Sequence, residues 1–273
     1  MTDATVAVAH APSIPGRLAD NAEQAVRLIS ASAQAGASIA ILPELFLSGY
    51  DVGGILDAPD RHVVTAGDPI CTVLQRACAR HEIASIVGGA VALADGIANA
   101  ALVIAPDGTL VHVYRKVHLW GQEAQAFVAG SQPTLVDLAG LRIGMSICFD
   151  AGFPEHVRAL TLAGADFIAC PAAFAVGEER QRYDLYYPTR ALENTIYVAV
   201  SNAVGKQGGL EMFGDSSIFG PRGNRICRIG SELGVETARL NRREIEQARE
   251  DLPYLRDLAD RGAAKPEIVE WRW

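Results

Sequence analysis

The chain has 273 residues, of which 49% are hydrophobic and 21% charged, and its net charge at neutral pH is −8. This balance is typical of a well-packed globular α/β protein, and the acidity argues against a nucleic-acid partner. The sequence contains no uninterrupted run of about 18 apolar residues, which argues against a membrane partner, and the first residues lack the basic segment of a signal peptide. Five cysteines without a CxxC pair indicate free thiols in a reducing compartment. We therefore expect a cytoplasmic protein with no metal or other cofactor.

Strands and helices alternate along the first half of the chain. An apolar strand over 4–10 is followed by a helix over 18–35, which Gly36 ends, and by a continuous apolar strand over 38–42. Residues 51–65 are rich in glycine, aspartate and proline and are predicted to form a surface loop. The remaining predicted elements of this half are a helix over 69–81 and strands over 83–93, 98–105 and 110–114.

The second half continues the pattern. A short buried strand over 141–147 leads into a helix that starts near Phe153, with Pro154 in its first turn. Further predicted elements are strands over 166–170, 195–202 and 216–219, a helix over 183–194, and a helical segment after 241 that becomes irregular from Asp251. Strands occur both between helices and in hairpin runs, so we expect one α/β domain over 1–273 with mixed sheets and helices outside.

A carboxylate, a lysine and a cysteine each follow a predicted buried strand. Glu44 comes just after 38–42, Lys116 after 110–114, and Cys148 at the turn from strand to helix. Strand ends at the carboxyl side meet in a common crevice in α/β folds, and a turn into a helix offers backbone N–H groups to an anion. The arrangement suits a nucleophile, although a cysteine at such a place can also be a small buried hydrophobe.

Other common chemistries lack their motifs in this chain. There is no GxSxG, GxGxxG, P-loop or HExxH pattern, and the six histidines fall at no metal-ligand spacing. The competing arrangement for a nucleophile is a pair of Cys148 with His118 or His156.

Three segments carry a resemblance to a known family. Residues 43–50 (PELFLSGY), 114–119 (YRKVHL) and 146–155 (SICFDAGFPE) resemble, in the same order, the signature segments of the nitrilase superfamily of carbon–nitrogen hydrolases. The likeness continues over nearly the whole chain. It implies a four-layer α-β-β-α sandwich, and a triad of Glu44, Lys116 and Cys148. Many members carry a second glutamate four residues before a phenylalanine, which corresponds to Glu123.

The resemblance also implies a reaction. A small amide would be cleaved to a carboxylate and ammonia through a thioester on Cys148, with Glu44 as general base. Lys116 and the backbone N–H of Phe149 would stabilise the oxyanion, and Glu123 would hold the amide nitrogen. Predicted substrate-binding residues are Tyr50, Trp120, Phe149, Ala172, Ala173 and Phe174.

The four positions after the cysteine bear on the substrate. Nitrilases usually have Trp-Glu where this chain has Phe149 and Asp150, and N-carbamoyl amino acid hydrolases have arginines where it has Ala151 and Gly152. We therefore favour an amidase acting on aliphatic amides or ω-amides; an ω-amide carboxylate would need a cation, such as Arg115 or an arginine within 178–190. The alternatives are a nitrilase, an N-carbamoyl amino acid hydrolase, an acyl transferase, and a non-catalytic scaffold.

Association is a further expectation. The family pairs sheet to sheet with a second subunit, so we expect a homodimer or higher homo-oligomer. The aromatic tail from about residue 251 is predicted at the subunit interface, because exposed aromatic side chains are costly to leave in water.

Overall fold

The computed structural model describes residues 3–260. One of its two large sheets is mixed and has the strand order β15-β1-β2-β4-β5-β6. The central strands β1, β2 and β4 are parallel, the outer ones antiparallel, and the short β3 pairs with β4. Its strands are β1 (Ala4–His10), β2 (Ile39–Ile41), β3 (Val63–Val64), β4 (Ala84–Leu93), β5 (Gly96–Ile104), β6 (Leu110–Arg115) and β15 (Gly234–Leu240).

The second sheet repeats this plan with the order β14-β13-β10-β9-β8-β7, in which β8, β9 and β10 are parallel. Its strands are β7 (Thr134–Leu138), β8 (Leu141–Met145), β9 (Phe167–Ala172), β10 (Tyr197–Asn202), β13 (Ser217–Phe219) and β14 (Arg225–Arg228). A separate hairpin consists of β11 (Val204–Gln207) and β12 (Leu210–Phe213).

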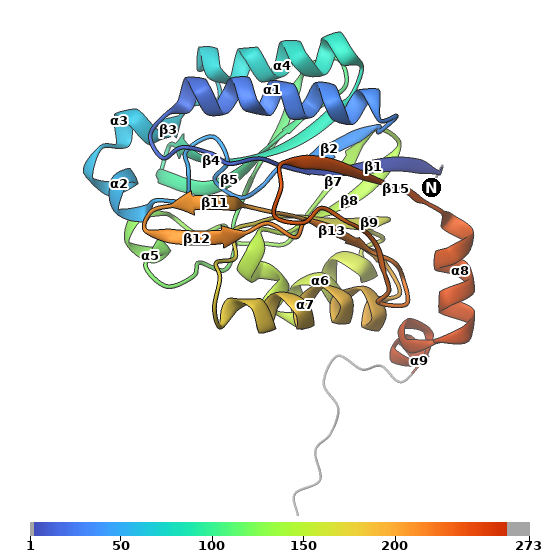
Figure 1. Cartoon of the computed structure of the whole chain (residues 1–273). Coiled ribbons are helices and arrows are strands. Elements are labelled where there is room, and N and C mark those ends of the chain that lie inside the picture. Colours follow the sequence, from blue (N-terminus) through green and yellow to red (C-terminus); the bar gives the residue numbers. More distant parts are fainter. Residues whose placement is uncertain (1–2, 261–273) are drawn as a thin grey trace, which may run out of the picture.

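The two sheets lie face to face and helices cover their outer faces (Figure 1). Helices α1 (Leu18–Gln34) and α4 (Pro69–His81) pack on the first sheet, and α6 (Pro154–Leu162) and α7 (Glu179–Asn194) on the second. Alternate side chains of a strand face opposite sides: Val6 and Val8 enter the core between the sheets, whereas Ala7 and Ala9 face α1 and α4. The predicted α-β-β-α sandwich with mixed sheets is therefore confirmed.

Some local predictions are wrong. Residues 51–65 do not form a plain loop but contain α2 (Val52–Asp57), α3 (Pro59–His62) and β3. The Asp51 carboxylate accepts a hydrogen bond from the Gly54 N–H at 3.0 Å, and Pro59 starts α3. Both are standard helix-start signals, but such short helices have too few apolar positions to show a period.

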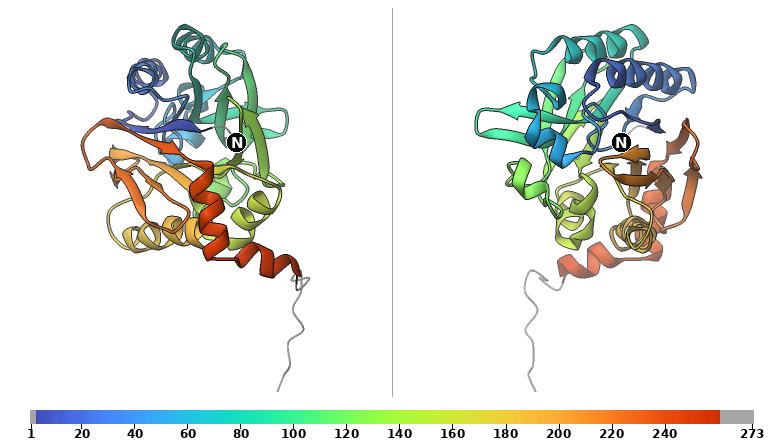
Figure 2. Two further views of the ribbon diagram at one scale, coloured as in Figure 1. Left: turned by 90° about the vertical axis from the view of Figure 1, so that its right-hand side faces the viewer. Right: turned by 60° about the vertical axis from the view of Figure 1, so that its left-hand side comes forward.

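The C-terminal prediction is wrong in part as well. Residues 254–260 are not irregular, because α8 (Arg242–Asp251) is followed by α9 (Tyr254–Asp260). Helix α8 runs down one side of the sandwich, and α9 turns off at its lower end (Figure 2). The predicted interface tail also includes residues 261–273, which lie outside the described residues. Helix α7 begins at Glu179 rather than at residue 183. Strands β7, β11, β12, β14 and β15 were not predicted, because most of them carry exposed polar residues.

No helix within residues 3–260 is long and apolar enough to cross a membrane.

Candidate active site

Cys148 sits at a sharp turn between β8 and α6. It opens a short 3₁₀ helix, η1 (Cys148–Gly152), and its φ of +45° lies in the left-handed region. A non-glycine residue there is strained, and such strain persists only where the surroundings enforce it. The side chain is 8% exposed, and the N–H of Ala173 points to the thiol and favours its ionised form. The turn therefore fixes a nearly buried thiol at the carboxyl end of the second sheet.

Lys116 follows β6 directly, and both its backbone N–H and its carbonyl are hydrogen-bonded. Its N–H donates to Asn99 O at 2.9 Å, and its carbonyl accepts from Gly130 N–H at 2.8 Å. The side chain is fully buried, and Nζ donates to Glu44 at 2.6 Å and to Glu123 at 2.8 Å. Burial alone would lower the pKa of the ammonium, but the two carboxylates outweigh it and raise the pKa above its usual value. Lys116 is therefore a permanent cation.

Glu44 follows β2 in a loop that runs against β4. A Cβ on Gly88 of β4 would lie 2.2 Å from Pro43 O, so only glycine permits this close approach. Glu44 Oε1 accepts from Lys116 Nζ at 2.6 Å and from Asn99 Nδ2 at 2.7 Å, whereas Oε2 has no partner among the described residues. Burial raises the pKa of this carboxyl to about 7, although Lys116 pulls it down. Glu44 can therefore gain and lose a proton near neutral pH.

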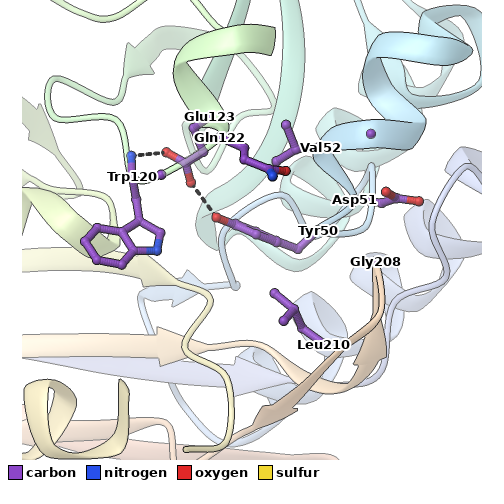
Figure 3. A pocket seen from close by; sticks show the side chains of 10 residues that line it. Tyr50, Asp51, Val52, Trp120, Gln122, Glu123, Gly208 and Leu210 are labelled. Carbon is purple, nitrogen blue, oxygen red and sulfur yellow. Dashed lines mark hydrogen bonds between the residues drawn. The ribbon is translucent and has the colours of Figure 1, made fainter. Parts of the chain in front are cut away.

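Glu123 begins the short helix α5 (Glu123–Ala126) and is fully buried. Tyr50 Oη donates to its Oε1 at 2.7 Å and the Trp120 N–H to its Oε2 at 2.9 Å (Figure 3). With Lys116 at 2.8 Å, both oxygens are already engaged. In this arrangement Glu123 holds Lys116 and Tyr50 in place.

The thiol keeps its proton until a base removes it. Burial and the nearby Glu44 carboxylate raise the pKa of Cys148 well above its usual value, against the opposing effect of Lys116. Thiolate formation is therefore favoured only when the proton moves to a neighbouring group, and Glu44 has the free oxygen to receive it.

Asp150 links the lysine segment to the cysteine turn, a role that the sequence did not reveal. Its side chain is fully buried and accepts four hydrogen bonds, from Tyr114 Oη (2.8 Å), Ile147 N–H (2.9 Å), His118 N–H (2.8 Å) and His118 Nδ1 (2.9 Å). Burial opposes ionisation, but these donors and His156 hold the pKa of this carboxyl below its usual value.

The histidines do not pair with the thiol in the structure. His118 Nδ1 is bonded to Asp150, and His156 Nε2 to Met145 O at 3.0 Å. His118, Asp150 and His156 nevertheless come within 4.8 Å of one another, a grouping that sequence spacing did not reveal. Hydrogen bonds join His118 to Asp150, whereas His156 Nδ1 has no partner among the described residues. The four donors already occupy both Asp150 oxygens, so the carboxylate braces the His118 segment.

A cavity of about 390 Å³ adjoins this cluster. Of the six predicted substrate-binding residues, Tyr50 and Trp120 line it, and the Trp120 ring lies 4.7 Å from that of Phe149. Ala172 and Phe174 are buried, the latter against Tyr183 and Tyr187. The full lining consists of Tyr50, Asp51, Val52, Gly53, Trp120, Gly121, Gln122, Glu123, Gly208 and Leu210.

Comparison with known proteins agrees with this geometry. The sequence model of the family described as carbon–nitrogen hydrolase matches residues 5–250. The chain belongs to the carbon–nitrogen hydrolase family. Its sequence is 33% identical over 260 residues to a Pseudomonas protegens protein described as a hydrolase in the pqqF 5′ region. The alignment covers 94% of this chain and 88% of the other. The chain is 29% identical to an omega-amidase of Xenopus laevis (87% and 88% covered).

Among solved structures, the chain is similar to an amidase. The amidase from Nesterenkonia sp. AN1 superposes with a TM-score of 0.80 and 26% identity, covering 93% of this chain and 96% of the other. That structure carries an acetamide moiety covalently added at the active-site cysteine of the amidase, and another structure of the same enzyme holds butyramide. The chain is therefore an amidase-type member of the carbon–nitrogen hydrolase family, as the resemblance of its motifs predicted.

Proposed function

We propose that the protein hydrolyses the carbon–nitrogen bond of a small linear amide through a thioester on Cys148. The observation that carries the proposal is Lys116, which is buried between Glu44 and Glu123. One oxygen of Glu44 has no partner among residues 3–260, and the Glu44 carboxylate acts electrostatically on the Cys148 thiol. The adduct at the active-site cysteine and the bound butyramide in the Nesterenkonia amidase support a nucleophilic cysteine and a small amide substrate. The 28% identity to a 2-oxoglutaramate amidase of Bacillus subtilis supports amide hydrolysis.

Acylation would begin with transfer of the Cys148 proton to Glu44 Oε2 while Sγ attacks the amide carbonyl carbon. The resulting oxyanion accepts hydrogen bonds from the third Nζ–H of Lys116 and from the backbone N–H of Phe149. Glu44 then gives the proton to the amide nitrogen, the C–N bond breaks, and ammonia leaves. The acyl group remains on Cys148 as a thioester.

Deacylation uses the same base. Glu44 removes a proton from a water molecule that attacks the thioester carbon, and the tetrahedral oxyanion returns to the same donors. Collapse releases the carboxylic acid, and the proton on Glu44 returns to the Cys148 sulfur. Throughout, Glu123 keeps Lys116 in place, and Tyr50 and Trp120 form a wall beside the acyl chain.

Ammonia release tests this proposal. Aliphatic amides, ω-amides, nitriles and N-carbamoyl amino acids would be supplied to the wild type and to Cys148→Ala, with mass spectrometry for an acyl adduct on Cys148. We expect release from amides only, an adduct in the wild type, and no turnover by Cys148→Ala. Turnover by Cys148→Ala would refute the mechanism.

The same panel separates the alternatives. Turnover of nitriles or carbamoyl compounds in place of amides would identify another branch of the superfamily, and acylated amines formed with added amine would identify acyl transfer. A folded protein silent across the panel and without an adduct would favour a non-catalytic scaffold.

We also propose that the protein is a cytoplasmic homo-oligomer, dimeric or larger. Five free cysteines suit a reducing compartment, and Tyr254 on α9 is 45% exposed in the single chain. Light scattering at micromolar protein should give at least twice the chain mass; a monomeric mass would contradict association.

A further inference from the structure

If the proposed function holds, the acyl part of the amide would lie in the cavity that adjoins the catalytic cluster. Tyr50 and Glu123 belong to both the cluster and the cavity, and in Figure 3 Asp51 lies on the opposite side of Tyr50 from Trp120. Leu210, at the start of β12, adds an apolar side chain that is 45% exposed. The charges around this space bear on which acyl chains it accepts.

The lining carries negative charge and no matching cation. Asp51 and Glu123 are its charged members, and within residues 3–260 no lysine, arginine or histidine belongs to it. Lys116 stands behind Glu123, where two carboxylates at 2.6 and 2.8 Å already match its charge. A substrate carboxylate in the cavity would therefore face Asp51 and Glu123, and no cation of the lining would be available to pair with it.

The arginines that the sequence offered for an ω-amide carboxylate are engaged elsewhere. Arg115 pairs with Asp95 at 2.9 Å, and Arg180 pairs with Asp184 and Asp215 at 2.8 and 2.6 Å. Arg190 is 6% exposed and donates to Ala151 O and Gly152 O at 2.8 and 3.1 Å. These three side chains are therefore already paired with carboxylates or backbone carbonyls.

Arg182 contacts a residue of the cavity wall. Its guanidinium lies 4.1 Å over the ring of Trp120, and Glu179 pairs with it at 3.1 Å. The Glu179 carboxylate is in turn fixed by the Ala175 N–H at 2.7 Å. The local charge at this rim is therefore close to zero.

These observations favour one class of acyl chain. A carboxylate that enters a cavity loses hydration and needs a cation or several donors in exchange, whereas a neutral chain packs against Tyr50, Trp120 and Leu210. An ammonium is attracted by the Asp51 carboxylate and by aromatic faces. Resting on the proposed amide hydrolysis, we infer that the site takes short primary amides whose acyl chain is uncharged or ends in an ammonium, and that it discriminates against ω-amides with a free carboxylate.

Four amides of similar length test the inference at pH 7: butyramide and succinamide are neutral, β-alaninamide is cationic, and succinamate is anionic. We expect ammonia from the first three, and kcat/KM for succinamate about 100-fold below that for its neutral isostere succinamide, because like charges brought together cost several factors of ten. A ratio below tenfold, or a preference for succinamate, overturns the inference. If no amide is hydrolysed, the proposed function fails instead.

Variants of the cavity wall sharpen the test. Leu210→Arg should raise succinamate turnover relative to succinamide at least about tenfold by supplying a cation, and Leu210→Met should leave this ratio unchanged; equal ratios in both variants would count against the inference.

Asp51→Asn keeps the helix cap and should lower β-alaninamide turnover relative to butyramide; an unchanged ratio removes the ammonium from the inferred class. Arg182→Gln should leave the selectivity unaltered, and a specific loss of succinamate turnover would overturn the inference.

Discussion

Replacement of Asp150 by asparagine tests the link between the two halves of the site. The Asp150 carboxylate accepts four hydrogen bonds, two at each oxygen. Asparagine retains one acceptor oxygen and turns an NH₂ group toward the other two donors. Since a hydrogen bond to a charged group contributes about 1.5–3 kcal/mol, we expect the free energy of unfolding to fall by about 3–6 kcal/mol. Turnover should fall as well, because the segment of Lys116 and the turn of Cys148 would shift relative to each other.

Urea unfolding and ammonia release would be measured on Asp150→Asn and on Asp137→Asn as the matched control. Asp137 is 80% exposed and pairs with Arg142 at 3.3 Å on the surface, so its loss should change the unfolding free energy by less than about 1 kcal/mol. An Asp150→Asn protein within about 1 kcal/mol of the wild type, with normal turnover, would refute the reasoning.

The pH dependence of this difference gives a second readout. The pKa of Asp150 is held below its usual value in the folded state, so its stabilisation is present above the unfolded pKa, about 3.9. It is lost as the pH falls through the folded pKa. The stability gap between the wild type and Asp150→Asn should therefore narrow in acid; a gap independent of pH would place the effect outside the carboxylate charge.

Four further predictions concern the catalytic cluster. Lys116→Ala should lower kcat by at least about 10²–10³-fold, the cost of one oxyanion donor; a smaller loss would remove Lys116 from that role. Because Glu44 must be ionised to accept the thiol proton and its pKa is about 7, kcat/KM should rise as the pH increases through about 7, and a rate that falls over this range would contradict its assignment as base. Asn99→Ala removes a donor at 2.7 Å from Glu44, so the acidic limb of the pH–rate profile should move to higher pH; an unmoved limb would show that this bond does not tune the base. Tyr50→Phe removes the 2.7 Å bond to Glu123 and should cost about 1.5–3 kcal/mol in urea unfolding, a cost that a merely surface contact would not produce.

The placement of the three central groups could be predicted from the sequence because it follows from strand ends. Glu44, Lys116 and Cys148 each come just after an apolar run, and carboxyl ends of strands in one sheet system converge. The structure brings Lys116 to 2.6 Å from Glu44 and leaves both groups near the thiol. The apolar runs themselves were long enough to predict β1, β4 and α4 almost to the residue.

Other parts of the site depend on contacts that no local pattern encodes. Leu210 reaches the cavity because a two-stranded hairpin folds over Tyr50, and the sequence marks that hairpin only by Gly208 and Gly209. Asn99 carries a signal that was available: it is a polar residue within an apolar strand, and a buried amide needs partners. His118 and His156 come together in the folded chain, where the turn that carries Asp150 is hydrogen-bonded to the His118 segment.

The partner of the first strand is made long after that strand itself. Strand β1 pairs with β15 from Ala4 opposite Leu240 to His10 opposite Gly234. At the usual 5–20 residues per second of translation, roughly 10–50 s separate the emergence of these two strands. Until then the nascent chain carries β1 with one open edge, the kind of edge that invites pairing with other chains. The sheet that supports Glu44 and Lys116 thus closes only after residues 234–240 have left the ribosome, and a chain stalled before residue 234 would be left without this closing strand.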